Sequence, residues 1–211
     1  MEKNKKNGMM ILTTVITLLP IIYGLIIWDK LPEMVPTHWN AAGEIDGYSS
    51  KALAVLGLPA FLAVVNIVCQ IATRLDPKSK NHSDKVYMLI VWIVPVLSII
   101  LVPMTLFAAQ GVEVDVTTIS MLICGVLFLI IGNYLPKCRQ NYTIGIKVPW
   151  TLESEENWNK THRLAGFIWT ICSVIIIIAT FLGYPLVMLP VMLIMTIVPI
   201  VYSYMLYRKG I

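Results

Sequence analysis

Six long apolar segments without a single Asp, Glu, Lys or Arg constrain this 211-residue chain more than any other feature. About 20 predominantly apolar residues are enough to cross the hydrocarbon core of a bilayer as a helix. Charged residues make up only 13% of the chain, about half the share that is usual for soluble domains. The sequence therefore predicts an all-α polytopic membrane protein with six transmembrane helices. We expect these spans at residues 9–28, 52–72, 86–109, 117–134, 164–182 and 185–207.

The first span is too long for the apolar core of a signal peptide, so we expect it to remain in the mature protein. Lys and Arg are distributed unevenly between alternate connections. Fourteen lie in the N-terminus, the second and fourth connections and the C-terminus, against only Lys30 and Lys51 in the others. Positively charged loops stay on the cytoplasmic side. The count predicts cytoplasmic N- and C-termini, a small ordered outer loop at residues 29–51 and one larger cytoplasmic loop before the fifth span.

The outer loop has the residues of a short β-hairpin. Pro32 and Pro36 keep its first part extended. Gly43 can adopt a positive φ in the turn after "THWN", and Asp46–Gly47 is expected to form a second turn. An irregular segment of this length cannot lie in lipid, so we expect it to pack over the outer ends of the helices.

Acidic residues on the outer side would attract a basic partner. His38, Glu44 and Asp46 are also types of metal ligand, but one histidine and two carboxylates without tight spacing form a weak metal motif. We therefore assign no metal site. The four cysteines show no CxxC pair, so neither a disulfide framework nor a zinc site is indicated.

The cytoplasmic loop, residues 135–163, changes its periodicity midway. Residues 144–149 alternate apolar and polar side chains, as an extended segment does, and Pro149 favours an extended Val148. A helix is then expected to start at Ser154 or Thr151 as N-cap, with Glu155 and Glu156 in its first turn and Glu156 one turn before Lys160.

This helix is expected to continue into the fifth span. Trp158, His162 and Ala165 recur at helical spacing and define one face, and we place Trp158 at the membrane interface.

In the second span, Asn66 and Gln70 lie one turn apart. Interhelical hydrogen bonding is the favoured interpretation of this pair, with a substrate site as the alternative.

A lone His162 could act as a general base, but the sequence supplies no activated nucleophile, oxyanion donors or phosphate-binding glycine loop. We assign no catalytic residue and no cofactor, and expect the protein not to be an enzyme. The basic residues of the cytoplasmic loops are too dispersed to indicate nucleic-acid binding, and we expect them to contact anionic membrane lipid.

The stretch "GNYLPKCRQNYTIGIKVPWTLESEENWNKTHRLAG", residues 132–166, closely resembles the signature of the SdpI family, bacterial membrane proteins that include the immunity protein against the Sdp toxin. The outer stretch "LPEMVPTHWNAAGEIDGYSSK" resembles a small domain of unknown function that often precedes this signature. Lys147 stands where the signature commonly has arginine, which keeps the charge but loses bidentate bonding. Segment 1–72 would hold the first two spans with the outer-loop domain, segment 73–135 the third and fourth spans, and segment 136–211 the signature loop with the last two spans.

The resemblance implies a bacterial inner-membrane immunity protein that protects the cell against a secreted toxin-like peptide. It also implies a signal transducer that holds a small cytoplasmic autorepressor at the membrane. The proposed cytoplasmic docking and signature residues are Asn133, Arg139, Asn141, Gly145, Pro149, Trp150, Thr151, Trp158, His162 and Arg163. The proposed outer-loop sensing residues are Pro36, His38, Trp39, Asn40, Gly43 and Asp46.

Three alternatives stay open. The first is a small-molecule transporter or permease, although the spans lack the ionisable residues that ion-coupled transport uses. The second is a membrane enzyme that uses His162 with Glu153 or Glu155 at the cytoplasmic face. The third is a passive assembly factor for another membrane protein.

Overall fold

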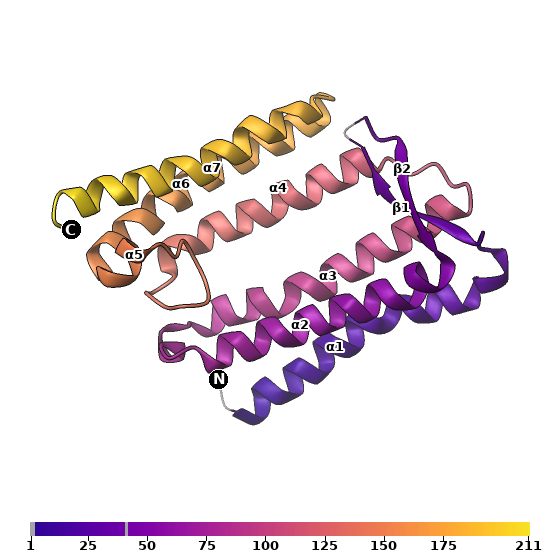
Figure 1. Ribbon diagram of the computed structural model, residues 1–211, viewed down its shortest axis with the longest axis horizontal. Coiled ribbons are helices and arrows are strands. Elements are labelled where there is room, and N and C mark those ends of the chain that lie inside the picture. The colour runs from indigo at the N-terminus through magenta and orange to yellow at the C-terminus, as the bar shows by residue number, and fades with distance from the viewer. Residues whose placement is uncertain (1–2, 41) are drawn as a thin grey trace. The chain divides into compact units, whose positions relative to one another are not determined.

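The computed structural model describes residues 3–40 and 42–211, and within them six helices are long and apolar enough to cross a membrane (Figure 1). The prediction of six spans is confirmed, and the chain is a polytopic membrane protein. The long helices are α1 (Lys3–Ile26), α2 (Leu58–Leu75, after a π-helical turn at Leu53–Gly57), α3 (Asp84–Ala109), α4 (Val116–Tyr134), α6 (Glu155–Phe181) and α7 (Met188–Arg208). Helix α5 (Pro149–Glu153) is short, and 3₁₀ turns lie at Trp28–Lys30, Ser79–Asn81, Leu135–Lys137 and Pro185–Val187.

The chain folds as two compact units. Unit 1 consists of Met1–Arg74 and Tyr87–Val116, and so contains α1, α2, most of α3 and a small β-sheet. Unit 2 consists of Leu75–Val86 and Thr117–Ile211, and so contains the loop between α2 and α3 together with α4 to α7. Large apolar side chains such as Phe61 in unit 1 and Phe167 in unit 2 are about two-thirds exposed, as lipid-facing positions require.

Unit 1 has its apolar core near the ends of the helices that adjoin the sheet. The buried cluster contains Ile27, Leu31, Val35, Ala54, Val55, Val102 and Leu106. Val35 comes from the outer loop, which therefore packs on the helix ends as predicted. A Cβ on Gly24 would lie 2.6 Å from Val55, so the close approach of α1 to the π-helical turn requires glycine.

A buried polar cluster joins α1 to α2 farther along unit 1. The Gln70 amide donates to Thr13 Oγ1 at 2.9 Å, and the Asn66 amide donates to the same oxygen at 3.2 Å. All three side chains are fully buried. The predicted interhelical hydrogen bonding of Asn66 and Gln70 is therefore confirmed.

The predicted hairpin of the outer loop is also confirmed. Strand β1 (Met34–Trp39) pairs antiparallel with β2 (Ile45–Ser50). Gly43 has a φ of 81°, as its place in the turn predicts. Met1, Glu2 and Ala41 lie outside the described residues.

The second turn predicted at Asp46–Gly47 is wrong, because both residues lie inside β2. The ladder is irregular on either side of His38, which pairs with Gly47. A Cβ at position 47 would lie 2.8 Å from His38 Cβ. The glycine therefore allows close strand approach at a bulge and does not reverse the chain.

Unit 2 is built around the pair α6 and α7, with a buried cluster of Met121, Cys172, Ile176, Val191 and Met195. Glycines let α4 and α6 approach closely, since a Cβ on Gly132 would lie 2.9 Å from the Thr170 nitrogen. The predicted tight connection between the last two spans turns at Gly183, with φ 74°. There the Tyr184 N–H donates to the Ala179 carbonyl at 2.9 Å, which closes the helix end in a Schellman motif.

Candidate functional site

The loop between α4 and α6 folds through bonds from side chains to its own backbone. Asn141 Oδ1 accepts the N–H groups of Thr143 at 2.9 Å and Ile144 at 2.7 Å. Thr151 Oγ1 donates to the Ile146 carbonyl at 2.8 Å and accepts the Val148 N–H at 3.1 Å. The predicted extended segment is thus wrong at residues 144 and 145, which form a bend, and at Pro149, which begins α5, and side chains satisfy backbone groups that a strand would pair with a neighbouring strand. Val148 is extended as predicted, with φ −115° and ψ 156°.

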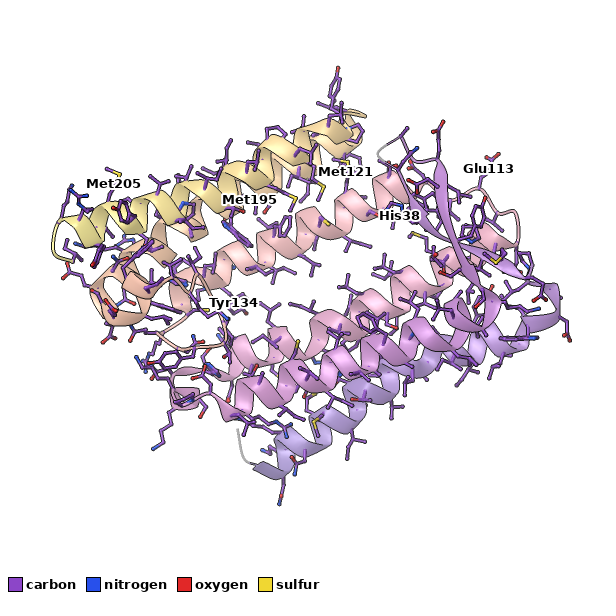
Figure 2. All side chains as sticks on the ribbon, viewed as in Figure 1. His38, Glu113, Met121, Tyr134, Met195 and Met205 are labelled. Atoms are coloured by element: carbon purple, nitrogen blue, oxygen red, sulfur yellow. The ribbon has the colours of Figure 1, made fainter. Side chains whose placement is uncertain are left out.

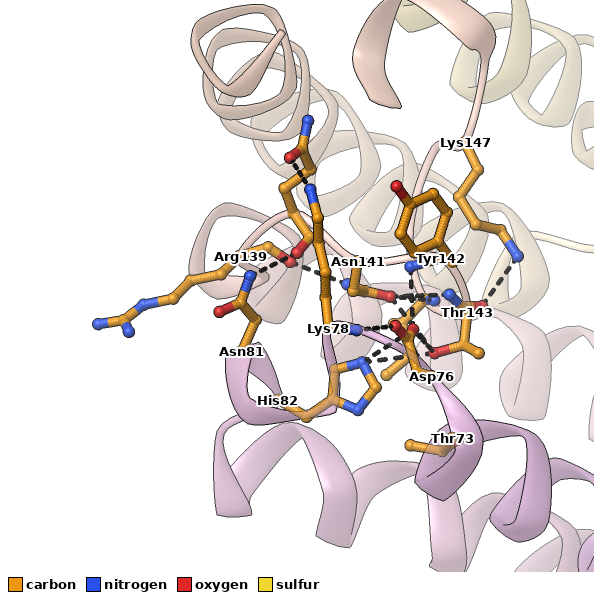
Figure 3. Close-up of polar contacts among 12 residues, drawn as sticks. Thr73, Asp76, Lys78, Asn81, His82, Arg139, Asn141, Tyr142, Thr143 and Lys147 are labelled. Carbon is orange, nitrogen blue, oxygen red and sulfur yellow. Dashed lines mark hydrogen bonds and ion pairs between the residues drawn. The ribbon is translucent and has the colours of Figure 1, made fainter. Parts of the chain in front are cut away.

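Asp76, in the connection that follows α2, holds this loop from a distant part of the sequence (Figure 3). Its Oδ2 accepts the Tyr142 N–H at 2.9 Å and the Thr143 hydroxyl at 2.8 Å. Its Oδ1 accepts the Lys78 N–H at 2.7 Å, and His82 Nε2 lies 3.4 Å from Oδ2. The carboxylate therefore binds two loops of unit 2 to each other.

The environment of Asp76 favours its charged form. The residue is only 4% exposed. Burial alone would raise the pKa of Asp76, but the hydrogen bonds from Thr143, Lys78 and Tyr142, together with the charge of His82, hold this pKa below its usual range. Asp76 is thus an ionised structural group.

Gln140 adds a second connection between the same two loops. Its amide nitrogen donates to the Thr151 and Leu152 carbonyls, both at 2.9 Å, and its side-chain oxygen accepts from Lys78 Nζ. The Asn81 amide donates to the Gln140 carbonyl at 2.7 Å. These bonds fix α5 against the connection between α2 and α3.

The side chains of His162 and Trp158 pack against the loop between α4 and α6. The two rings stack with centroids 4.0 Å apart, and both side chains are buried. His162 Nδ1 donates to the Trp158 carbonyl at 2.8 Å, and Nε2 accepts the Ile146 N–H at 2.9 Å, so these partners assign the neutral Nδ1–H tautomer. Gly145, with φ 111°, lies so close to this ring that a Cβ would overlap Nε2.

The position of Trp158 at the membrane interface stays a prediction, but its ring faces the interior of the protein and has no surface for lipid. Its side chain is fully buried, and its Nε1–H donates to the Cys138 carbonyl at 2.7 Å. The helical part of the prediction is confirmed. Ser154 Oγ accepts the Asn157 N–H at 3.1 Å as the N-cap, and Glu156 pairs with Lys160 at 2.7 Å. The alternative N-cap, Thr151, lies inside α5 instead.

Asn157 is a fully buried residue that the sequence did not predict to be part of the site. Its amide nitrogen donates to the Ser203 carbonyl at 3.0 Å and to the Ile211 carbonyl at 3.1 Å, and its oxygen accepts from the Ser203 hydroxyl at 2.7 Å. It thereby joins the start of α6 to the end of α7. Exposed polar or charged residues, Glu155, Glu156, Asn159 and Lys160, lie on both sides of Asn157 and Trp158, so no local pattern marks Asn157 as a buried residue.

The predicted cytoplasmic residues separate into two groups by exposure. Those with exposed side chains are Asn133, Arg139, Pro149 and Arg163. Those that are buried are Asn141, Thr151, Trp158 and His162, and Gly145 and Trp150 are half-buried. Trp150 packs on α7, with its ring 5.4 Å from that of Tyr204 and 6.0 Å from that of Tyr207. A partner that docks here would contact the first group, while the buried group fixes the shape of the loop.

The predicted outer-loop residues lie together on the hairpin. His38 Nδ1 is 2.5 Å from Asp46 Oδ1, and Asn40 donates to Glu44 at 3.0 Å while its Oδ1 accepts the Glu44 N–H. Pro36 is buried, and Trp39 is half-buried. In the part of the chain that the structure describes, no group of three or more His, Cys, Asp or Glu side chains could hold a metal ion.

Two family models match this chain. Residues 137–203 match the SdpI/YfhL protein family, and residues 15–63 match a domain of unknown function, DUF1648. Over 97% of both chains, the sequence is 27% identical to "Immunity protein SdpI" of Bacillus subtilis (strain 168). The chain is thus similar to the SdpI/YfhL protein family in its last third and to the Bacillus subtilis protein along nearly its whole length. The resemblance of the signature and of the outer loop is therefore confirmed.

A shorter match supports no function. An uncharacterized protein of Archaeoglobus fulgidus is 39% identical over 54 residues, which are 26% of this chain and 29% of that protein. No solved structure matches the chain significantly. The SdpI/YfhL match contains α5, α6 and most of α7, and thus most of the loop that Asp76 and His162 hold in place.

Proposed function

We propose that this chain is an integral membrane immunity protein that protects a bacterial cell against a secreted toxin-like peptide. The observation that carries this proposal is the similarity to the Bacillus subtilis immunity protein, which extends over 97% of both chains. The similarity includes both the hairpin and the signature loop. It therefore supports a common function for the whole chain and is not limited to the membrane spans.

We place the hairpin outside the cell and both termini in the cytoplasm of a bacterial inner membrane. The fourteen-to-two distribution of Lys and Arg supports this orientation. In it, the outer-loop residues predicted to sense a peptide face the side from which a secreted toxin arrives. Cysteine labelling of Ser50→Cys and Lys209→Cys in spheroplasts, on a background without native cysteines, tests this topology.

We propose further that the cytoplasmic loop reports the toxin by holding a small autorepressor at the membrane. The exposed residues Arg139 and Arg163 offer donors to an acidic surface. The buried bonds of Asp76 and His162 would keep this surface in one shape. Reversal of both charges, in Arg139→Glu with Arg163→Glu, should release the repressor and leave toxin protection intact.

The alternative of an enzyme that uses His162 has less support from the geometry. Both ring nitrogens of His162 already bond to backbone groups, so neither is free to take a proton from a substrate. The transporter alternative predicts substrate flux in proteoliposomes, which the immunity proposal does not require.

The direct test is a toxin challenge. The chain is expressed in a Bacillus subtilis strain that lacks its own SdpI, and the cells are exposed to that strain's toxin and, separately, to the medium of the organism from which the chain comes. Survival with the chain and death with an empty vector support the proposal. Equal killing of both cell lines by both preparations, at confirmed membrane expression, would refute it.

A further inference from the structure

The two strands of the outer hairpin differ in what surrounds them. Strand β1 anchors the hairpin, since Val35 is fully buried in the helix-end cluster and Pro36 is buried beside it. Strand β2 has no buried residue at any of its six positions. It is thus the outward strand of the hairpin.

The hairpin also leaves β2 with a free edge. Among the described residues the sheet has two strands, so each strand has a single partner. An unpaired strand edge presents backbone N–H and C=O groups that can pair with another extended chain. Pro36 removes one donor from β1, whereas β2 contains no proline. The edge of β2 is therefore the better template for a third strand.

The side chains around this edge combine apolar area with negative charge. Tyr48 is 54% exposed and Ile45 is 40% exposed. Glu44 and Asp46 are exposed beside them, whereas Glu113, at the same end of unit 1 as His38 (Figure 2), lies outside the sheet. Charge complementarity favours a partner that has cationic side chains next to apolar ones.

We infer that the β2 edge binds an extended, cationic and amphipathic segment of the toxin-like peptide, which adds to the hairpin as a third strand. Main-chain hydrogen bonds to β2 supply affinity, and the alternation of side chains along the added strand supplies selectivity. Cationic side chains on the added strand would lie near Glu44 and Asp46, and apolar ones on the opposite face near Ile45. This inference rests on the proposed immunity function, because that function supplies the peptide.

The experiment uses the full chain in nanodiscs of zwitterionic lipid and three fluorescent ten-residue probes. The first probe alternates lysine and leucine, the second has the same sequence with alternate backbone nitrogens methylated, and the third replaces lysine by glutamate. Fluorescence anisotropy gives each Kd after subtraction of binding to empty nanodiscs. The lysine probe should bind about tenfold more tightly than either of the others.

Three protein variants complete the test. Glu44→Gln with Asp46→Asn should weaken the lysine probe about tenfold, and the matched control Glu113→Gln, an acid outside the sheet, should not. Equal affinity for the methylated probe would overturn strand addition. An unchanged Kd in the double variant would overturn the charge argument. A peptide-free dimer in native mass spectrometry that Tyr48→Pro abolishes would assign the edge to a second copy of the chain, which also overturns the inference.

The toxin challenge separates failure of this inference from failure of the proposed function. If the native chain protects cells and Tyr48→Pro protects them equally, the immunity function stands and the β2 edge is not its binding site. If the native chain fails to protect but still binds the lysine probe with the expected selectivity, the edge stands as a peptide site and the immunity function fails.

Discussion

Replacement of Asp76 by alanine should open the loop between α4 and α6 without unfolding the helices. The substitution removes the acceptor of the Tyr142 N–H and the Thr143 hydroxyl, and it leaves His82 without its carboxylate. These are the bonds that join the connection after α2 to the loop before α5. The effect should therefore be confined to residues 138–148 and their immediate partners.

The magnitude follows from the number of bonds lost. A buried donor that loses its acceptor costs about 1–3 kcal/mol, and Asp76 serves two such donors in this loop. Water that enters the opened loop accepts hydrogen bonds from some of these donors. The loop should therefore lose about 3 kcal/mol of stability. Since 1.4 kcal/mol corresponds to a tenfold change in an equilibrium constant, the open population should rise by about a hundredfold.

Hydrogen exchange followed by mass spectrometry measures this population in detergent or nanodiscs. Peptides that cover residues 138–148 should exchange about a hundredfold faster in Asp76→Ala, and peptides from the middle of α6 should not change. Glu153→Ala is the matched control, because Glu153 is an exposed acid nearby on α5 and its loss should change exchange less than about threefold. If Asp76→Ala resembles Glu153→Ala in the loop peptides, the structural role assigned to Asp76 is refuted.

Three further predictions concern the same unit. The depressed pKa of Asp76 means that its carboxylate stabilises the loop fully above pH 3.8, its ordinary value, and that this stabilisation is lost as the pH falls through the lower folded-state value. Loop exchange in the native chain and in Asp76→Asn should therefore converge below pH 3.8. Gly145→Ala should destabilise the loop by about 2–4 kcal/mol, because it combines a left-handed φ with an overlap on His162 Nε2. Asn157→Ala should lower the stability of the protein by about 1–3 kcal/mol, seen as a lower Tm and faster exchange at the end of α7, whereas the exposed neighbour Asn159 should tolerate alanine.

Each of these predictions has a clear contrary result. A constant difference between native and Asp76→Asn exchange down to pH 2 would mean that another group controls the acid response. Wild-type exchange in Gly145→Ala would show that the loop relaxes around a Cβ. Equal Tm values for the alanine variants of Asn157 and Asn159 would show that the bonds to α7 contribute no stability.

The parts of the fold that the sequence predicted depend on neighbouring residues. A span is recognised from a run of apolar residues. The start of α6 is recognised from Ser154 and the two acidic residues that follow it. The hairpin was predicted for the same reason, because Gly43 and the preceding residues form their turn within a few positions. In each case the decisive contacts join residues close together in the chain.

The parts that the sequence did not reveal depend on contacts between distant segments. Asp76 lies 66 residues before Tyr142, its backbone partner, and nothing near "RLDPK" indicates which loop will supply the donors. Trp158 was placed at the membrane interface because tryptophans near span ends are common there. Its burial and its bond to the Cys138 carbonyl arise only when the preceding loop folds back, which no local pattern predicts.

The buried bonds change which experiment can identify a docking surface. A loop that folds without strands must satisfy its backbone with side chains, and Asp76, Asn141, Thr151 and His162 do this here. An alanine at any of them would disturb the loop and would abolish docking whether or not that residue touches a partner. Loss of function in His162→Ala therefore cannot show whether His162 contacts the partner or only stabilises the loop. Charge reversal at Arg139 and Arg163 can, because both are exposed and their replacement leaves the buried bonds in place. If protection and repressor binding both survive that reversal while loop exchange stays native, the signature loop is a structural element of this chain, and its partner surface lies elsewhere.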